Sequence, residues 1–88
     1  MALSQVFVED SFVDECDVSG TIRGHSIELS GVGVTSFVES IKRAARERGR
    51  GYGDMFFVLV SSGVEYRGCT LSGSGSIARV HFLTSVEL

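Results

Sequence analysis

Apolar and polar residues follow a strand-like pattern in the first third of the chain. Residues 3–8 are apolar and partly β-branched, which predicts a strand. Further strands are expected over 18–23 and 25–30, and the second of these alternates as a half-buried strand does. Gly24 between them either turns a hairpin or bends one long strand. The acidic residues 9–17 show no helical period and are expected to form a loop or a bent strand end.

The pattern changes to a helical period after residue 35. Ser36 is followed three positions later by Glu39, the spacing of a capping box that satisfies free backbone N–H groups of a first turn. Gly49 suits the left-handed residue that often ends a helix. One helix of about three turns is therefore predicted within residues 36–50. Its apolar face would consist of Phe37, Ile41, Ala44 and Ala45.

The longest apolar run covers residues 55–60, after a flexible, glycine-rich connection over 49–53. Because this run does not alternate, it predicts a central strand with both faces covered. The helix would cover one face, and a chain of 88 residues has little left to cover the other. The run therefore favours either a dimer or a curled, barrel-like sheet.

A meander of three strands is predicted for the C-terminal part, beginning with the run just described. Ser62-Gly63 has the composition of a two-residue hairpin turn, and residues 64–71 form the return strand with Gly68 as a bulge. A second turn is expected at 72–75, followed by one long strand over 77–86. The fold class is α+β: a single curved antiparallel β-sheet, in the order β-β-β-α-β-β-β, with one helix packed on it.

Size and composition limit the possible classes of protein. The chain has a mass of 9.5 kDa and is expected to form one domain over residues 1–88. Its apolar runs are far shorter than the roughly 20 residues of a membrane-spanning helix, and no signal peptide is expected. Cys16 and Cys69 are too few for a disulfide-rich scaffold, which predicts free thiols and a cytoplasmic location.

Charges are segregated along the chain, although the net charge is only −3. Residues 1–35 hold six acids and one base, whereas residues 36–53 hold five bases and two acids. Either these regions pair with each other, within one fold or across a homomeric interface, or the basic helix meets an acidic partner. Two partner-binding surfaces are predicted. The acidic one consists of Asp10, Asp14, Glu15 and Asp17, and the basic one of Lys42, Arg43, Arg46 and Arg50, with Tyr52 as an aromatic that could stack on a base.

Catalytic and cofactor-binding patterns are weak. Two cysteines and two histidines are present, but no local signature joins them into a nucleophilic site. No spacing matches a metal site, and the acidic stretch does not match a calcium loop. The glycines of Gly31-Val32-Gly33 lack the rest of a nucleotide-binding fingerprint. No catalytic residue, metal or cofactor is therefore predicted.

The favoured interpretation is a small non-enzymatic protein-binding module, homodimeric or a higher oligomer. Inhibitors, adaptors and accessory subunits of larger assemblies, viral ones included, belong to this class, and the sequence does not choose among them. One alternative is a nucleic-acid-binding protein that uses the basic helix over 36–50 with Tyr52. Another is a small enzyme that combines Cys16 or Cys69 with a histidine.

Overall fold

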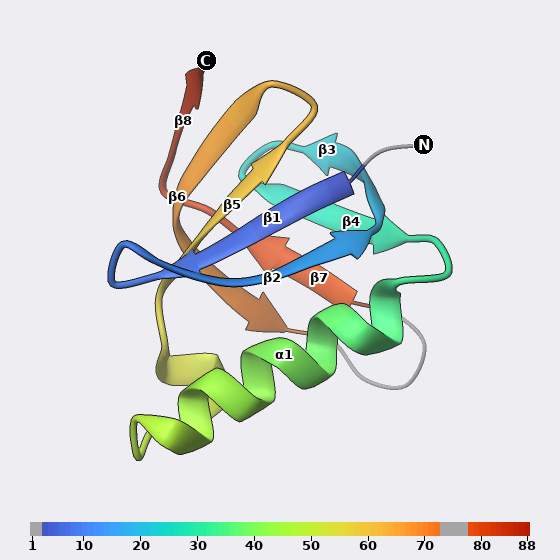
Figure 1. Ribbon diagram of the computed structural model, residues 1–88. Helices are drawn as coiled ribbons and strands as arrows, with labels where there is room; N and C mark the ends of the chain where they lie inside the picture. Colours follow the sequence, from blue (N-terminus) through green and yellow to red (C-terminus); the bar gives the residue numbers. More distant parts are fainter. Residues whose placement is uncertain (1–2, 73–77) are drawn as a thin grey trace.

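The computed structural model describes residues 3–72 and 78–88 as a curved sheet with one helix (Figure 1). The strands are β1 (Leu3–Val8), β2 (Ser11–Asp17), β3 (Ser19–Arg23), β4 (Ser26–Ser30), β5 (Phe57–Ser61), β6 (Val64–Ser72), β7 (Ala78–His81) and β8 (Thr84–Glu87). The helix is α1 (Val34–Glu47), and a short 3₁₀ turn, η1 (Tyr52–Asp54), follows it. The predicted turn at 72–75 lies largely outside the described residues.

All strand pairs in the sheet are antiparallel, in the order β2-β1-β5-β6-β7-β4-β3, and β8 pairs with β6. The two ends of this path, β2 and β3, are successive segments of one bent strand joined through Val18. A sheet whose ends are covalently continuous has to curl. The predicted α+β fold, one curved antiparallel sheet with a single helix packed on it, is confirmed.

The acidic segment is a strand, so of the two expectations for residues 9–17, a loop or a bent strand end, the loop is wrong. Strand β2 pairs with β1 along its whole length, with a register shift after Val6. The turn between them uses Glu9 and Asp10, whose φ angles are 53° and 64°. Two left-handed residues are what a two-residue hairpin requires, but glycine or asparagine usually supplies them. The sequence therefore carried no recognisable turn signal at this point.

The core lies between the concave side of the sheet and the apolar face of α1. All four residues of the predicted helical face are buried, and the Phe37 ring meets the Phe57 ring edge-on at 6.1 Å between centroids. Strand β5 does not have both faces covered, so this prediction is wrong. Phe57 and Leu59 are buried, whereas Val58 is only partly buried and Phe56, just before the strand, is exposed. Buried and more exposed side chains therefore alternate along this run, although all of its residues are apolar.

The predicted start of the helix is wrong and its predicted end is confirmed. Helix α1 begins at Val34, with Gly33 at the N-cap and no capping side chain, so the Ser36–Glu39 pair lies inside the helix. A Cβ on Gly33 would lie 2.7 Å from the backbone N and O of Asp17, so this close approach requires glycine. At the other end, Gly49 has φ 66° and donates to the Arg46 carbonyl, in a Schellman motif.

Strand β6 changes partners along its length. Its first part pairs with β8 and its second part with β7. The predicted bulge at Gly68 is confirmed, because Gly68 has φ 66° and the register with β5 shifts between Tyr66 and Cys69. A Cβ on Gly68 would lie 2.8 Å from the Leu83 side chain, which would have to move, and the positive φ also favours glycine.

The predicted single strand over 77–86 is wrong, because the chain divides into β7 and β8. The Leu83 N–H donates to the Arg67 carbonyl at 3.0 Å, where the chain passes from one half of β6 to the other. Since β6 bends at its bulge, a strand that follows it must break as well. The predicted hairpin turn at Ser62-Gly63 is confirmed, and of the two alternatives left open at Gly24 the structure has the hairpin rather than a bend in one long strand.

Candidate interaction surfaces

The convex side of the sheet, which we call the outer face, carries apolar side chains from three strands. Val6 and Leu59 point into the core, so their strand neighbours Phe7 and Val58, which are opposite each other, point outward. Phe12 on β2 is paired with Phe7, and their rings meet edge-on at 5.7 Å. Phe12 is 57% exposed. A large aromatic at this exposure, beside other partly exposed apolar residues, is typical of an interaction surface.

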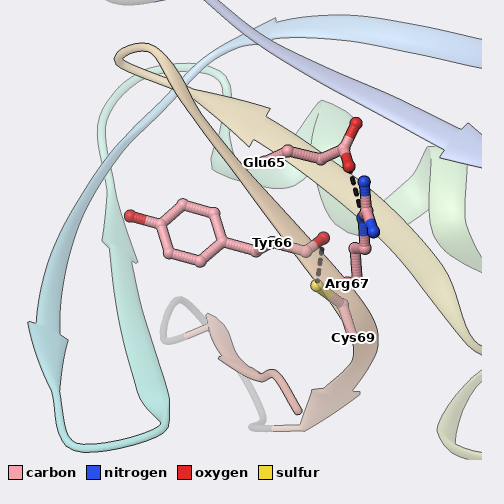
Figure 2. A network of polar contacts seen from close by, with 4 residues as sticks. All are labelled: Glu65, Tyr66, Arg67 and Cys69. Carbon is pink, nitrogen blue, oxygen red and sulfur yellow. Dashed lines mark hydrogen bonds and ion pairs between the residues drawn. The ribbon is translucent and has the colours of Figure 1, made fainter. Parts of the chain in front are cut away.

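A groove of about 460 Å³ crosses the outer face. Its lining residues are Phe7, Asp10, Val58, Glu65 and Arg67. The Glu65 carboxylate and the Arg67 guanidinium form an ion pair, and Figure 2 shows both on one side of β6 with the Tyr66 ring on the other. The groove thus combines an apolar floor with a charged rim, as the centre of a protein interface does.

The predicted acidic surface divides between two sides of the sheet. Asp10 lines the outer-face groove, and Glu15 lies on the same face, where it accepts a hydrogen bond from Gln5 at 3.1 Å. Asp17 ends β2 and its backbone carbonyl accepts from Gly33 at 3.0 Å. Asp14 points the other way, toward α1. Only part of the predicted acidic set is therefore placed together.

Asp14 connects β2 to the helix. Its carboxylate accepts hydrogen bonds from the Ser40 hydroxyl, from the backbone N–H of Glu15 at 2.8 Å and from the Cys16 thiol at 3.7 Å. The Ser40 bond is the main reason that the pKa of Asp14 lies below its usual range, and the nearby Arg43 charge adds to the effect. Asp14 therefore has a structural partner within the fold.

A second groove, of about 490 Å³, lies between β2 and α1. Its lining includes Phe12, Asp14, Arg43 and Arg48. Arg48 donates to the Ala44 carbonyl at 2.9 Å, and its Nε lies 3.8 Å from the Glu9 carboxylate. Some of the segregated charge is thus compensated within the fold.

The predicted basic surface is divided by the helix. Lys42 places its ammonium group 5.3 Å from the centroid of the Tyr52 ring, a cation–π contact between α1 and η1. Arg43 instead lines the groove beside β2. Arg46 and Arg50 are exposed. The structure therefore brings Lys42 and Tyr52 together, and directs Arg43 toward the acidic strand.

Both thiols are buried and free. Cys69 donates to the Tyr66 carbonyl at 3.2 Å (Figure 2), and burial raises its pKa to about 12. Burial, followed by the Asp14 charge, raises the pKa of Cys16 to about 11. A thiol with a raised pKa forms little thiolate at neutral pH and is a poor nucleophile.

Within residues 3–72 and 78–88, no cluster of three or more His, Cys, Asp or Glu side chains could hold a metal ion. No helix of this part of the chain is long and apolar enough to cross a membrane. No protein-family model matches the chain, and neither a curated protein nor a solved structure is significantly similar to it. The function must therefore be argued from the surfaces described above.

Sequence reasoning did not select Phe7, Val58 and Arg67 as surface residues. Phe7 and Val58 lie in apolar runs, where exposed and buried positions look alike in sequence. Arg67 lies on the return strand with no charged cluster around it. The alternating pattern of burial on β1 and β5 separates the two faces, and that pattern requires the strand register.

Proposed function

We propose that this protein is a small non-enzymatic protein-binding module of the cytoplasm, and that its outer face docks on a partner protein with an apolar centre and a basic rim. The observation that carries this proposal is the outer-face groove. Phe7 lines the groove beside Val58 and packs against the exposed Phe12 ring. Asp10 adds negative charge to the lining, and Glu15 adds a carboxylate elsewhere on the outer face. Inhibitors, adaptors and accessory subunits, including those of viral assemblies, act through surfaces of this kind.

The charges favour a basic partner. Arg67 is already engaged by Glu65, so Asp10 gives the groove lining one net negative charge. Complementary charge steers association, and the desolvated aromatic centre supplies most of the affinity. The buried thiols with raised pKa values support a binding role over cysteine-based catalysis. Free, buried cysteines also fit a reducing compartment.

A synthetic peptide of about eight alternating Lys and Val residues provides a defined probe, because an extended strand of this kind has one basic and one apolar face. We expect its titration to shift the backbone NMR signals of Phe7, Phe12 and Val58. Phe12→Ser should weaken binding about ten-fold, because it removes the exposed aromatic ring that packs against Phe7 beside the groove. The control variant Val32→Ser, at a residue 91% exposed on another part of the surface, should bind as the unmodified protein does.

A peptide of alternating Glu and Val residues tests the sign of the charge. Equal binding of both peptides, or signal shifts confined to residues outside the outer face, would contradict the proposal.

A second candidate function is nucleic-acid binding, which the contact between Lys42 and Tyr52 favours. An aromatic ring beside a cation is a stacking platform for an unpaired base. A single-stranded oligonucleotide of about twelve nucleotides serves as its probe. Shifts at Lys42 and Tyr52 that disappear steeply with added salt would support this alternative, since counterion release governs such binding. No shift at low salt would exclude it.

A further inference from the structure

We propose that β3 is the site at which two copies of this chain join, through antiparallel pairing of β3 with β3 of the second copy. Strand β3 forms the end of the sheet path and pairs only with β4 among the described strands (Figure 1). All five of its residues are exposed. An exposed strand edge presents unpaired N–H and C=O groups, which are a template for another strand.

Several of the usual protections of a free edge are missing on β3, whose one charged residue, Arg23, lies at its end. The strand contains no lysine and no proline, and it pairs with β4 without a bulge. Ile22 is opposite the buried Ile27, so it points toward the core side, yet it is 52% exposed. Beneath it lies a slot of about 150 Å³ whose apolar lining includes Leu59 and Tyr66. An apolar side chain at an unprotected edge is the position that a second strand would cover.

A second copy of β3 fits this edge better than an arbitrary strand. The antiparallel register that pairs all five residues places Thr21 opposite Thr21 of the second copy, and Ile22 opposite Gly20. Ile27 of the same chain fills the space over Gly20, where a Cβ would lie 2.3 Å from its Cγ2, so Ile22 of one copy would pack against Ile27 of the other. Asp17 precedes β3 and Arg23 ends it. Antiparallel pairing therefore brings the acidic end of each copy to the basic end of the other.

This inference does not rest on the proposed function, because β3 contributes no residue to the outer-face groove. The two surfaces can be tested separately. Phe12→Ser should leave the β3 pairing unchanged, and variants of β3 should leave peptide binding at the outer face unchanged.

Disulfide trapping reads the register directly. Thr21→Cys should form an interchain disulfide under mild oxidation, since directly opposed residues lie within the Cα distance that a disulfide spans. Ser19→Cys is the matched control on the same side of the same strand, because its two copies would lie about 13 Å apart along the strands. A mixture of Ser19→Cys and Arg23→Cys proteins should form the mixed dimer. The native thiols are buried and do not compete.

Light scattering after size exclusion measures the association itself. We expect a dimer whose dissociation constant rises at least ten-fold in Ile22→Lys, because a charge at this edge opposes strand pairing. Val32→Lys is the control and should remain dimeric. A protein that stays monomeric up to about 1 mM would overturn the proposal. A dimer that traps Ser19→Cys as readily as Thr21→Cys would overturn it too.

Discussion

Single residues decide how the acidic strand is joined to the helix. Asp14 is one of five acids between residues 9 and 17, and nothing in the sequence distinguishes it from the others. In the structure, Asp14 is the one acid of this segment that accepts a hydrogen bond from the buried Ser40 hydroxyl. A carboxylate that accepts several hydrogen bonds is stabilised in its charged form. At least one acidic residue of this segment, Asp14, therefore serves to hold β2 against α1.

This arrangement predicts a pH-dependent contribution to stability. The folded pKa of Asp14 lies below its unfolded value, so its contribution is present above the unfolded pKa and is lost as the pH falls through the folded pKa. Ser40→Ala removes the main cause of the shift and should lower the free energy of unfolding at pH 7 by about 1 kcal/mol, as is usual for a partly exposed, charged hydrogen bond. The difference should shrink as the pH falls below the unfolded pKa of 3.8 and through the lower folded pKa.

Urea unfolding at several pH values measures this effect. Ser36→Ala on the same helix is the control, because Ser36 is exposed and makes no capping hydrogen bond. A Ser40→Ala difference that stays constant from pH 7 to acid would show that the bond does not act through the charged carboxylate.

Individual elements were predictable where local chemistry agreed with the fold. The apolar face of α1, its end at Gly49, the turn at Ser62-Gly63 and the bulge at Gly68 all carry signals in nearby residues. The start of α1 carries no such local signal, because Gly33, which packs closely against Asp17, takes the N-cap position in place of a capping side chain. Contacts between residues distant in sequence cannot be deduced from local patterns.

The same distinction applies to the candidate site. The charged residues were selected because charge is visible in sequence, but their division between two sides of the sheet depends on β2 being a strand. The aromatic residues of the outer face were placed by the register of β1 with β2 and β5. Register is set by pairing across the sheet, which a single segment does not reveal.

At the scale of elements, Gly68 determines how β6 serves two neighbouring strands. Gly68→Ala should lower the free energy of unfolding by about 2 kcal/mol or more, because it adds a left-handed backbone penalty to a clash with Leu83. Gly24→Ala shares the positive φ angle but has open space around it, so it should lose only about 1 kcal/mol. Denaturant titrations of both variants provide the comparison.

A double variant separates the two causes. Leu83→Ala shortens the side chain that a Cβ at Gly68 would meet, so combining it with Gly68→Ala should cost less than the sum of the single effects. Additive effects would mean that the clash contributes nothing.

At the scale of the whole molecule, the curled sheet encloses a core but leaves two surfaces available. The outer face and the β3 edge are formed by strands at different places in the sheet path, and α1 covers the concave side. A domain of this size has little stability to spare, so apolar surface left exposed is costly unless it is covered in a complex. In the two proposals, a partner protein covers the outer face and a second copy of the chain covers the β3 edge.

The rates at which the two buried thiols are alkylated measure local and global unfolding of the chain, and they also test whether either cysteine is reactive enough for catalysis. With pKa values of about 11 and about 12, Cys16 and Cys69 should react with iodoacetamide at pH 7 at least about 100-fold more slowly than in the unfolded chain. Cys16 lies on the end strand β2 and should be labelled first, through local opening. Cys69 lies on the interior strand β6, so its labelling should require global unfolding and should quicken in Gly68→Ala.

Mass spectrometry of the labelled peptides, with time points in native buffer and in urea, distinguishes these outcomes. A thiol that reacts in native buffer as fast as in urea would contradict the burial of that residue. It would also revive the alternative of a cysteine-dependent enzyme, because an accessible thiolate is the first requirement of that chemistry. Slow labelling that follows the free energy of unfolding would instead identify both cysteines as core residues, and would leave the exposed surfaces as the places where this protein acts.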